Sequence, residues 1–117
     1  MDKDRREHTR FRISNEALAI LKPHPIKLGQ IINISEGGLA FQYLGDNKID
    51  SQYIELDIFV SKNGRQFNAF PFSKVRDFQI SSQFEKSTPI RQLCVRFDDL
   101  STEQISLLKN FISEYAA

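Results

Sequence analysis

Two short groups of residues in this sequence have the types and spacing needed to bind an anionic ligand. The first group lies near the start of the chain, where Arg6 and Arg10 are four positions apart and Arg5 directly precedes them. Guanidinium groups donate forked hydrogen bonds to phosphates and to the O6 and N7 edge of guanine, and they stack on flat rings. This group therefore suits the binding of phosphate and guanine groups, although arginines on a solvated terminal arm more often serve only solubility.

The second group is Asn33-x-Ser35-x-x-Gly38. In a regular strand, Asn33 and Ser35 lie on one face, and Ile32 and Ile34 lie on the other. If the isoleucines fill a core, the amide and the hydroxyl face outward together. Gly38 favours a tight turn and lets a ligand approach the backbone closely. The pattern predicts a small polar floor at the end of a strand.

The two motifs together, in this order and at this separation, resemble the PilZ domain, a bacterial receptor module for the second messenger cyclic di-GMP. The segment from Val95 to Ser101, which leads into an amphipathic stretch, also resembles the end of that family. The resemblance thus covers nearly the whole chain. It implies a nucleotide-binding β-barrel of the split PilZ type.

Carried over to this sequence, the resemblance implies that Arg6 and Arg10 bind the guanine and phosphate groups of cyclic di-GMP. It also implies that Asn33 and Ser35 hydrogen-bond the ligand and that Gly38 shapes the turn beneath it. Arg5 adds a third cation, which would reach a second ligand molecule, because a stacked pair of intercalated dinucleotides is known in the family.

The elements that must position these residues fit one compact domain. The chain has 117 residues, of which 40% are hydrophobic and 26% charged, as in ordinary globular proteins. We expect a flexible arginine-bearing arm at residues 1–10 and a single domain at 11–117. The net charge of +1 supplies no global field, so any anion site must be local.

The alternation of apolar and polar residues predicts a mainly β fold. In the segment 53–60, Ile54, Leu56, Ile58 and Val60 are expected on the buried face, with Asp57 on the solvent face. Six or seven strands emerge, which favours an antiparallel β-barrel because a flat sheet would leave both edges bare. The expected strands are 17–21, 27–35, 39–43, 53–60, 66–72, 75–80 and 93–97, with an exposed loop at 81–89.

The end of the chain changes to a helical period. Ser101 and Gln104 match a capping box, and apolar residues then recur at helical spacing. We expect a C-terminal α-helix at about 101–115. Its apolar stripe should pack on the open mouth or the flank of the barrel.

Other chemistry is not indicated by the sequence. His8, His24 and Cys94 lack metal-ligand spacing, so no metal and no cofactor are expected. No paired carboxylates or metal cluster suited to phosphodiester cleavage are visible, so the protein is not expected to be an enzyme. The single cysteine and the charged start of the chain, without an apolar run, favour a cytoplasmic protein without direct membrane insertion.

We therefore predict a cyclic di-GMP receptor that changes the conformation of its arm on binding and signals to an unidentified effector protein. One alternative is a PilZ-like interaction adaptor that does not bind cyclic di-GMP. Another is a small barrel that binds RNA or single-stranded DNA. A nucleic-acid polymer is the less favoured partner, because no aromatic platform or wide basic groove accompanies the arginines.

Overall fold

The computed structural model describes residues 9–14, 16–23, 27–45, 48–49, 52–81 and 88–116. Arg5, Arg6, His8 and His24, and most of the expected arm, therefore lie outside the described residues. The elements are β1 (Phe11–Arg12), β2 (Ala17–Lys22), β3 (Lys27–Ser35), β4 (Gly38–Leu44), β5 (Glu55–Val60), β6 (Gln66–Ser81), β7 (Ile90–Phe97) and α1 (Thr102–Tyr115).

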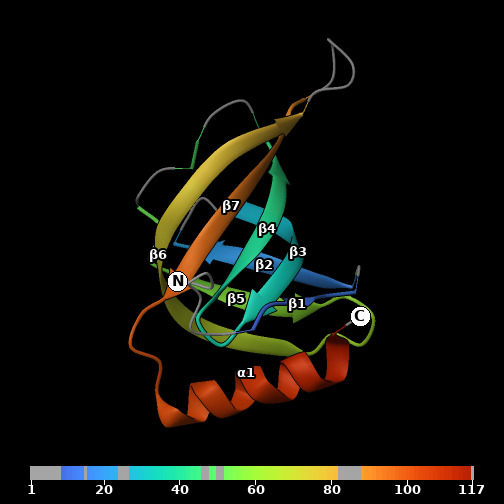
Figure 1. Cartoon of the computed structure of the whole chain (residues 1–117), viewed down its shortest axis with the longest axis vertical. Helices are drawn as coiled ribbons and strands as arrows, with labels where there is room; N and C mark the ends of the chain where they lie inside the picture. Colours follow the sequence, from blue (N-terminus) through green and yellow to red (C-terminus); the bar gives the residue numbers. More distant parts are fainter. Residues whose placement is uncertain are drawn as a thin grey trace, which may run out of the picture.

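The strands form a closed antiparallel barrel (Figure 1). The order β3-β2-β5-β6-β7-β4 returns to its start because β4 also pairs with β3, and β1 adds a short strand beside β3. Closure satisfies the backbone donors and acceptors that an open sheet would leave at its edges. The predicted antiparallel barrel with a C-terminal helix is confirmed.

Phenylalanine dominates the core of the barrel. Phe41, Phe70 and Phe111 are fully buried, and they come from β4, β6 and α1. The Phe67 and Phe111 rings meet edge to face with centroids 5.5 Å apart, within the range that favours aromatic pairs. The helix and the barrel therefore share one core.

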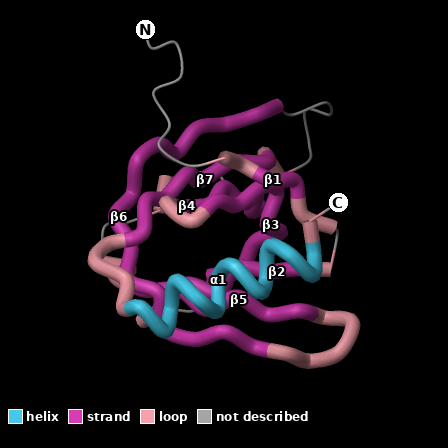
Figure 2. The backbone as a smooth tube through the Cα atoms, turned by 60° about the horizontal axis from the view of Figure 1, so that its bottom comes forward, coloured by secondary structure: helices cyan, strands magenta, loops and turns pink. Residues whose placement is uncertain are grey.

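Helix α1 crosses one end of the barrel (Figure 2). Its start is set by Ser101, whose hydroxyl accepts a hydrogen bond from the Gln104 backbone N–H, while the Gln104 side chain accepts one from the Ser101 N–H. This is the predicted capping box. The Gln104 side chain also donates to the Ala69 carbonyl at 2.8 Å, which ties the start of α1 to β6.

The segments 66–72 and 75–80, expected as two strands, form one continuous strand, β6. Its first part pairs with β5 and its remainder pairs with β7. Register shifts occur where Val75 and Ile80 are skipped in the pairing with β7. Because such bulges bend a strand without ending it, one strand can serve both sides of the barrel.

The expected exposure of two residues near β5 was wrong. Ile54 precedes the strand and is 62% exposed, whereas Asp57 is only 4% exposed. A bulge on β6 places two residues opposite Asp57, and the carboxylate accepts hydrogen bonds from the Ala69 N–H and the Gln66 amide. It also pairs with Lys22 at 3.1 Å. Asp57 is buried because it satisfies donors that the bulge frees from the strand ladder.

Candidate functional site

The two sequence motifs meet through Arg10 and Asn33. The Arg10 guanidinium donates a hydrogen bond of 3.0 Å to the Asn33 side-chain oxygen. The contact follows from the short pairing of β1 with β3, in which Phe11 faces Ile34 and Arg12 faces Asn33. The second arginine of the Arg-x-x-x-Arg motif is thus held against the first residue of the Asn-x-Ser-x-x-Gly motif.

A β-bulge gives Asn33 its position. The register of β3 against β4 passes from Ile31 opposite Phe41 to Asn33 opposite Ala40, so Ile32 is the extra residue. Ile31 and Ile34 are fully buried, whereas Ile32 is only half-buried. The expectation that Ile32 and Ile34 fill the core together holds for Ile34 alone, because the bulge interrupts the period of two.

Ser35 is buried, unlike the outward-facing hydroxyl that was expected. It is 6% exposed, and its hydroxyl accepts a hydrogen bond from the Gly37 N–H at 3.0 Å and donates to the Gly38 carbonyl at 3.4 Å. These contacts hold the two-residue turn between β3 and β4. In this structure the Ser35 side chain stabilises the turn instead of facing solvent beside Asn33.

Gly38 is required by the packing of the barrel. A Cβ added to it would lie 2.1 Å from the Val95 carbonyl oxygen on β7, far closer than real Cβ contacts. Gly38 pairs with Ser35 on one side and with Arg96 on the other. The glycine therefore allows β4 to approach the β7 backbone at the closure of the barrel.

A row of outward residues crosses the four strands β3, β4, β7 and β6, which lie side by side in Figure 1. Cross-strand pairing joins Asn33 to Ala40, Ala40 to Cys94, and Cys94 to Arg76. We call these four residues the outer row. Ala40 is fully buried but is not part of the apolar core cluster, and its side chain is only a methyl group.

A buried polar network lies on the inner side of the same strands. The Tyr43 hydroxyl donates to the Asp77 carboxylate at 2.6 and 2.8 Å, and the Arg91 guanidinium donates to Asp77 at 3.0 Å. The Ile49 N–H also donates to Asp77 at 2.7 Å. The network joins β4, β6 and β7 beneath the surface that carries the outer row and fixes their relative positions.

The network changes the acidity of two of its members. Burial and the hydrogen bond to Asp77 raise the pKa of Tyr43 to about 12. Burial alone would raise the pKa of Asp77, but hydrogen bonds from Tyr43, the Ile49 N–H and Arg91 outweigh it and lower that pKa. At neutral pH the network therefore contains a carboxylate, a guanidinium and a neutral phenol.

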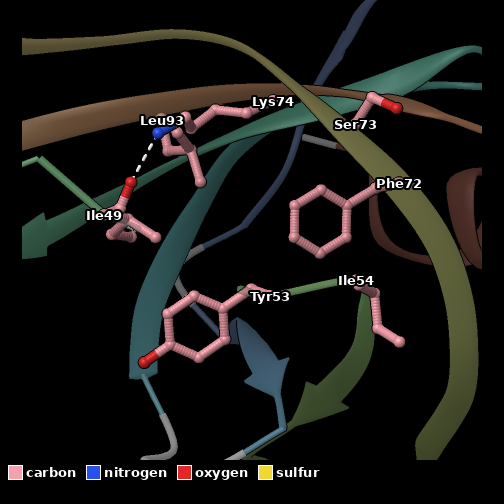
Figure 3. Close-up of a pocket in the computed structure, with 7 residues that line it drawn as sticks. All are labelled: Ile49, Tyr53, Ile54, Phe72, Ser73, Lys74 and Leu93. Atoms are coloured by element: carbon pink, nitrogen blue, oxygen red, sulfur yellow. Dashed lines mark hydrogen bonds between the residues drawn. The ribbon is translucent and has the colours of Figure 1, made fainter. Parts of the chain in front are cut away.

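A separate cavity of about 370 Å³ lies between the segment that precedes β5 and strands β6 and β7 (Figure 3). Mostly apolar side chains line it, and the Lys74 ammonium beside it donates a hydrogen bond to the Ile49 carbonyl. The lining residues are Ile49, Tyr53, Ile54, Phe72, Ser73, Lys74 and Leu93. Arg10, Asn33, Ser35 and Gly38, the predicted ligand-binding residues that the structure describes, do not line this cavity, so it is a different feature from the Arg10 surface.

The described part of the chain gathers Arg10, Asn33, Ser35 and Gly38 at one end of the β3–β4 hairpin. The sequence motifs do not include Arg76, which is aligned with Asn33 only through the register of three strand pairs. Within the described ranges, no group of three or more His, Cys, Asp and Glu side chains could hold a metal ion. The helix in these ranges is neither long nor apolar enough to cross a membrane.

The arrangement of strands and helix is the fold of a PilZ domain. The PilZ domain of YcgR from Escherichia coli, solved with c-di-GMP, superimposes with a TM-score of 0.74 at 14% identity over 96% of this chain and 92% of that domain. The K. pneumonia MrkH–c-di-GMP complex gives a TM-score of 0.71 at 17% identity over 95% of this chain. No protein-family model and no curated protein matches the sequence.

The similar structures differ in length from this chain. The chain covers 46% of the longer YcgR structure and 51% of the MrkH complex, so it spans about half of each. MrkH is described as a c-di-GMP-dependent transcription regulatory factor. The likeness at these identities establishes the fold, and the structural neighbours are binding proteins or regulators.

Proposed function

We propose that this domain is a receptor for cyclic di-GMP and acts by binding, not by catalysis. The hydrogen bond between Arg10 and Asn33 carries the proposal, because it joins the two motifs on one surface. Arg10 is exposed and presents its remaining donors to solvent. A guanidinium so positioned suits both the guanine edge and the phosphates of the ligand.

The other motif residues complete the proposed site. Arg6 would supply the second guanidinium, and Arg5 would determine whether a second ligand molecule stacks on the first. Asn33 would hydrogen-bond the ligand, either in place of its hydrogen bond with Arg10 or in addition to it. Ser35 and Gly38 would contribute mainly by holding the turn on which the ligand rests.

The proposed signal is a rearrangement of the segment before β1 when ligand binds. Arg10 already lies against β3, so binding would extend this contact toward Arg6 and Arg5. A change of this kind alters the surface that an effector protein can recognise. We propose a protein partner, and not a nucleic-acid polymer, as the reader of the signal in the cytoplasm.

Calorimetric titration of the protein with cyclic di-GMP tests the proposal. We expect binding in the micromolar range, which corresponds to about 8 kcal/mol. Arg10→Ala should weaken binding at least tenfold, because a bidentate arginine contact is worth about 1 to 3 kcal/mol. Lys109→Gln, a charge removal on the exposed side of α1, is the control and should bind normally.

Two outcomes of this titration would contradict the proposal. Absence of heat at tens of micromolar ligand would favour an adaptor that does not bind cyclic di-GMP. Unchanged binding by Arg10→Ala would remove Arg10 from the site. Where the wild type binds a stacked pair of ligands, Arg5→Ala should lower the stoichiometry from two ligands per protein to one.

A further inference from the structure

The outer row ends in a second cation that neither sequence motif contains. Arg76 lies on β6, three strand spacings from Asn33 through Ala40 and Cys94. At about 4.8 Å per strand, the two ends of the row are roughly 14 Å apart. Arg10 and Arg76 therefore stand at opposite borders of one strip of the barrel surface.

The Arg76 guanidinium is held in place by an aromatic ring. Its central carbon lies over the Phe78 ring at 4.3 Å from the centroid. Phe78 is the next outward residue along β6 and is half-buried, so the ring forms a firm base for the guanidinium. Stacking of this kind orients the plane of the guanidinium but leaves its N–H donors free to bind an acceptor.

Arg76 also differs from Arg91 and Arg96, the two arginines of β7. Among the described residues, no ion pair involves Arg76, although it is exposed. Its neighbour Asp77 faces inward and pairs with Arg91 at 3.0 Å. Arg96, the next cation on β7, has a carboxylate partner, Asp98, at 3.8 Å. The positive charge of Arg76 is therefore available to a ligand.

We propose that Arg76, stacked on Phe78, is a further cyclic di-GMP-binding residue that contacts the end of the ligand farther from Arg10. This inference rests on the proposed function. The ligand has two guanine bases and two phosphates, so it presents acceptors at both ends. The ligand would lie across β4 between the two arginines, where Gly38 and Ala40 carry at most a methyl side chain.

Titration of five proteins with cyclic di-GMP tests this proposal: the wild type, Arg10→Ala, Arg76→Ala, Arg76→Lys and Lys109→Gln. We expect Arg76→Ala to weaken binding at least tenfold while its melting temperature stays within about 2 °C of the wild type, because the side chain is on the surface. Arg76→Lys should keep only part of the wild-type affinity, since lysine keeps the charge but lacks the forked hydrogen-bond donors of the guanidinium.

Cys94 supplies a second readout. It is the single cysteine of the chain and lies directly between Ala40 and Arg76 in the outer row. We expect saturating cyclic di-GMP to slow alkylation of Cys94 by N-ethylmaleimide at least fivefold in the wild type. Saturating GMP, which has only one base and one phosphate, serves as the control and should protect Cys94 less.

The outcomes separate this inference from the proposed function. If the wild type binds and Arg10→Ala weakens binding, but Arg76→Ala binds normally, then the role of Arg76 is overturned and the receptor function stands. Cys94 that reacts at the same rate with saturating ligand would likewise show that the ligand does not reach β7. If the wild type does not bind at all, both the receptor function and the role of Arg76 fall.

Discussion

Replacing Tyr43 with phenylalanine tests the network that supports the outer row. The hydroxyl donates to both oxygens of Asp77 at 2.6 and 2.8 Å and accepts a hydrogen bond from Arg91 at 3.2 Å. A hydrogen bond to a charged group contributes about 1.5 to 3 kcal/mol. The ring itself remains packed against Phe41, with centroids 6.0 Å apart in the wild type. We therefore expect Tyr43→Phe to lower the free energy of unfolding by about 2 kcal/mol at pH 7.

The pH dependence of this difference identifies its origin. The pKa of Tyr43 is about 12 in the folded protein and 10.0 when unperturbed. Because the folded value is the higher one, the contribution is complete below pH 10 and is lost as the pH rises from 10 to 12. At 1.36 kcal/mol per pKa unit, about half of a total near 2.7 kcal/mol is lost by pH 11. The difference between wild type and Tyr43→Phe should thus shrink by about 1.4 kcal/mol between pH 8 and pH 11.

Urea unfolding followed by circular dichroism at pH 7, 8, 10 and 11 measures this difference. Other groups that titrate in this range, such as Lys22 with its raised pKa, are common to both proteins and cancel in the comparison. A difference that stays constant from pH 8 to pH 11 would refute the assignment of the raised pKa to Tyr43. A difference below about 0.5 kcal/mol at pH 7 would refute the energetic role of its hydroxyl.

Three further substitutions test the close approach of β4 to β7, the backbone at the β6 bulge and the carboxylate of the polar network. Gly38→Ala should destabilise the fold by about 2 kcal/mol or more in urea unfolding, because the added methyl meets the Val95 carbonyl at 2.1 Å; wild-type stability would contradict the close approach of β4 to β7. Ala69→Gly should raise the free energy of unfolding by about 0.5 to 1 kcal/mol, because Ala69 has a φ of 66° that glycine adopts more easily; a lower melting temperature would argue against strain at this bulge. Because the pKa of Asp77 is lowered in the folded protein, its carboxylate stabilises the fold above the unfolded pKa near 4, and this stabilisation is lost as the pH falls through the lower folded value. The free energy of unfolding of Asp77→Asn should therefore fall less steeply with acid than that of the wild type. An equally steep acid dependence in both proteins would exclude this role.

Local patterns in the sequence predict most of the elements, because alternation and capping act over a few residues. The strand expected at 27–35 agrees with β3, and Ser101 with Gln104 places the start of α1 correctly. The β6 bulges could not be predicted in the same way, since they depend on what each residue meets across the barrel. The burial of Asp57 has the same origin, because its donors come from β6.

The candidate site shows a similar division. The resemblance of the two motifs to the PilZ family predicted that Arg10 and Asn33 belong to one ligand site. The structure shows that these two side chains are in contact, and their role in binding stays a prediction. Arg76 carries no motif and is exposed like many surface arginines. Its place opposite Asn33 follows only from three consecutive strand registers, which no local pattern in the sequence contains.

The residues of the Asn-x-Ser-x-x-Gly motif have different roles in the barrel, and this decides which substitutions report on binding. Ser35 holds a turn with a buried hydroxyl, and Gly38 lets two strands approach, so changing either residue alters the barrel itself. Arg10 and Arg76 lie on the surface at the two borders of the strip. If substituting Ser35 or Gly38 weakens ligand binding, the loss of affinity therefore includes the effect of a disturbed fold. If substituting Arg10 or Arg76 weakens binding while the free energy of unfolding is unchanged, the loss measures the ligand contact directly.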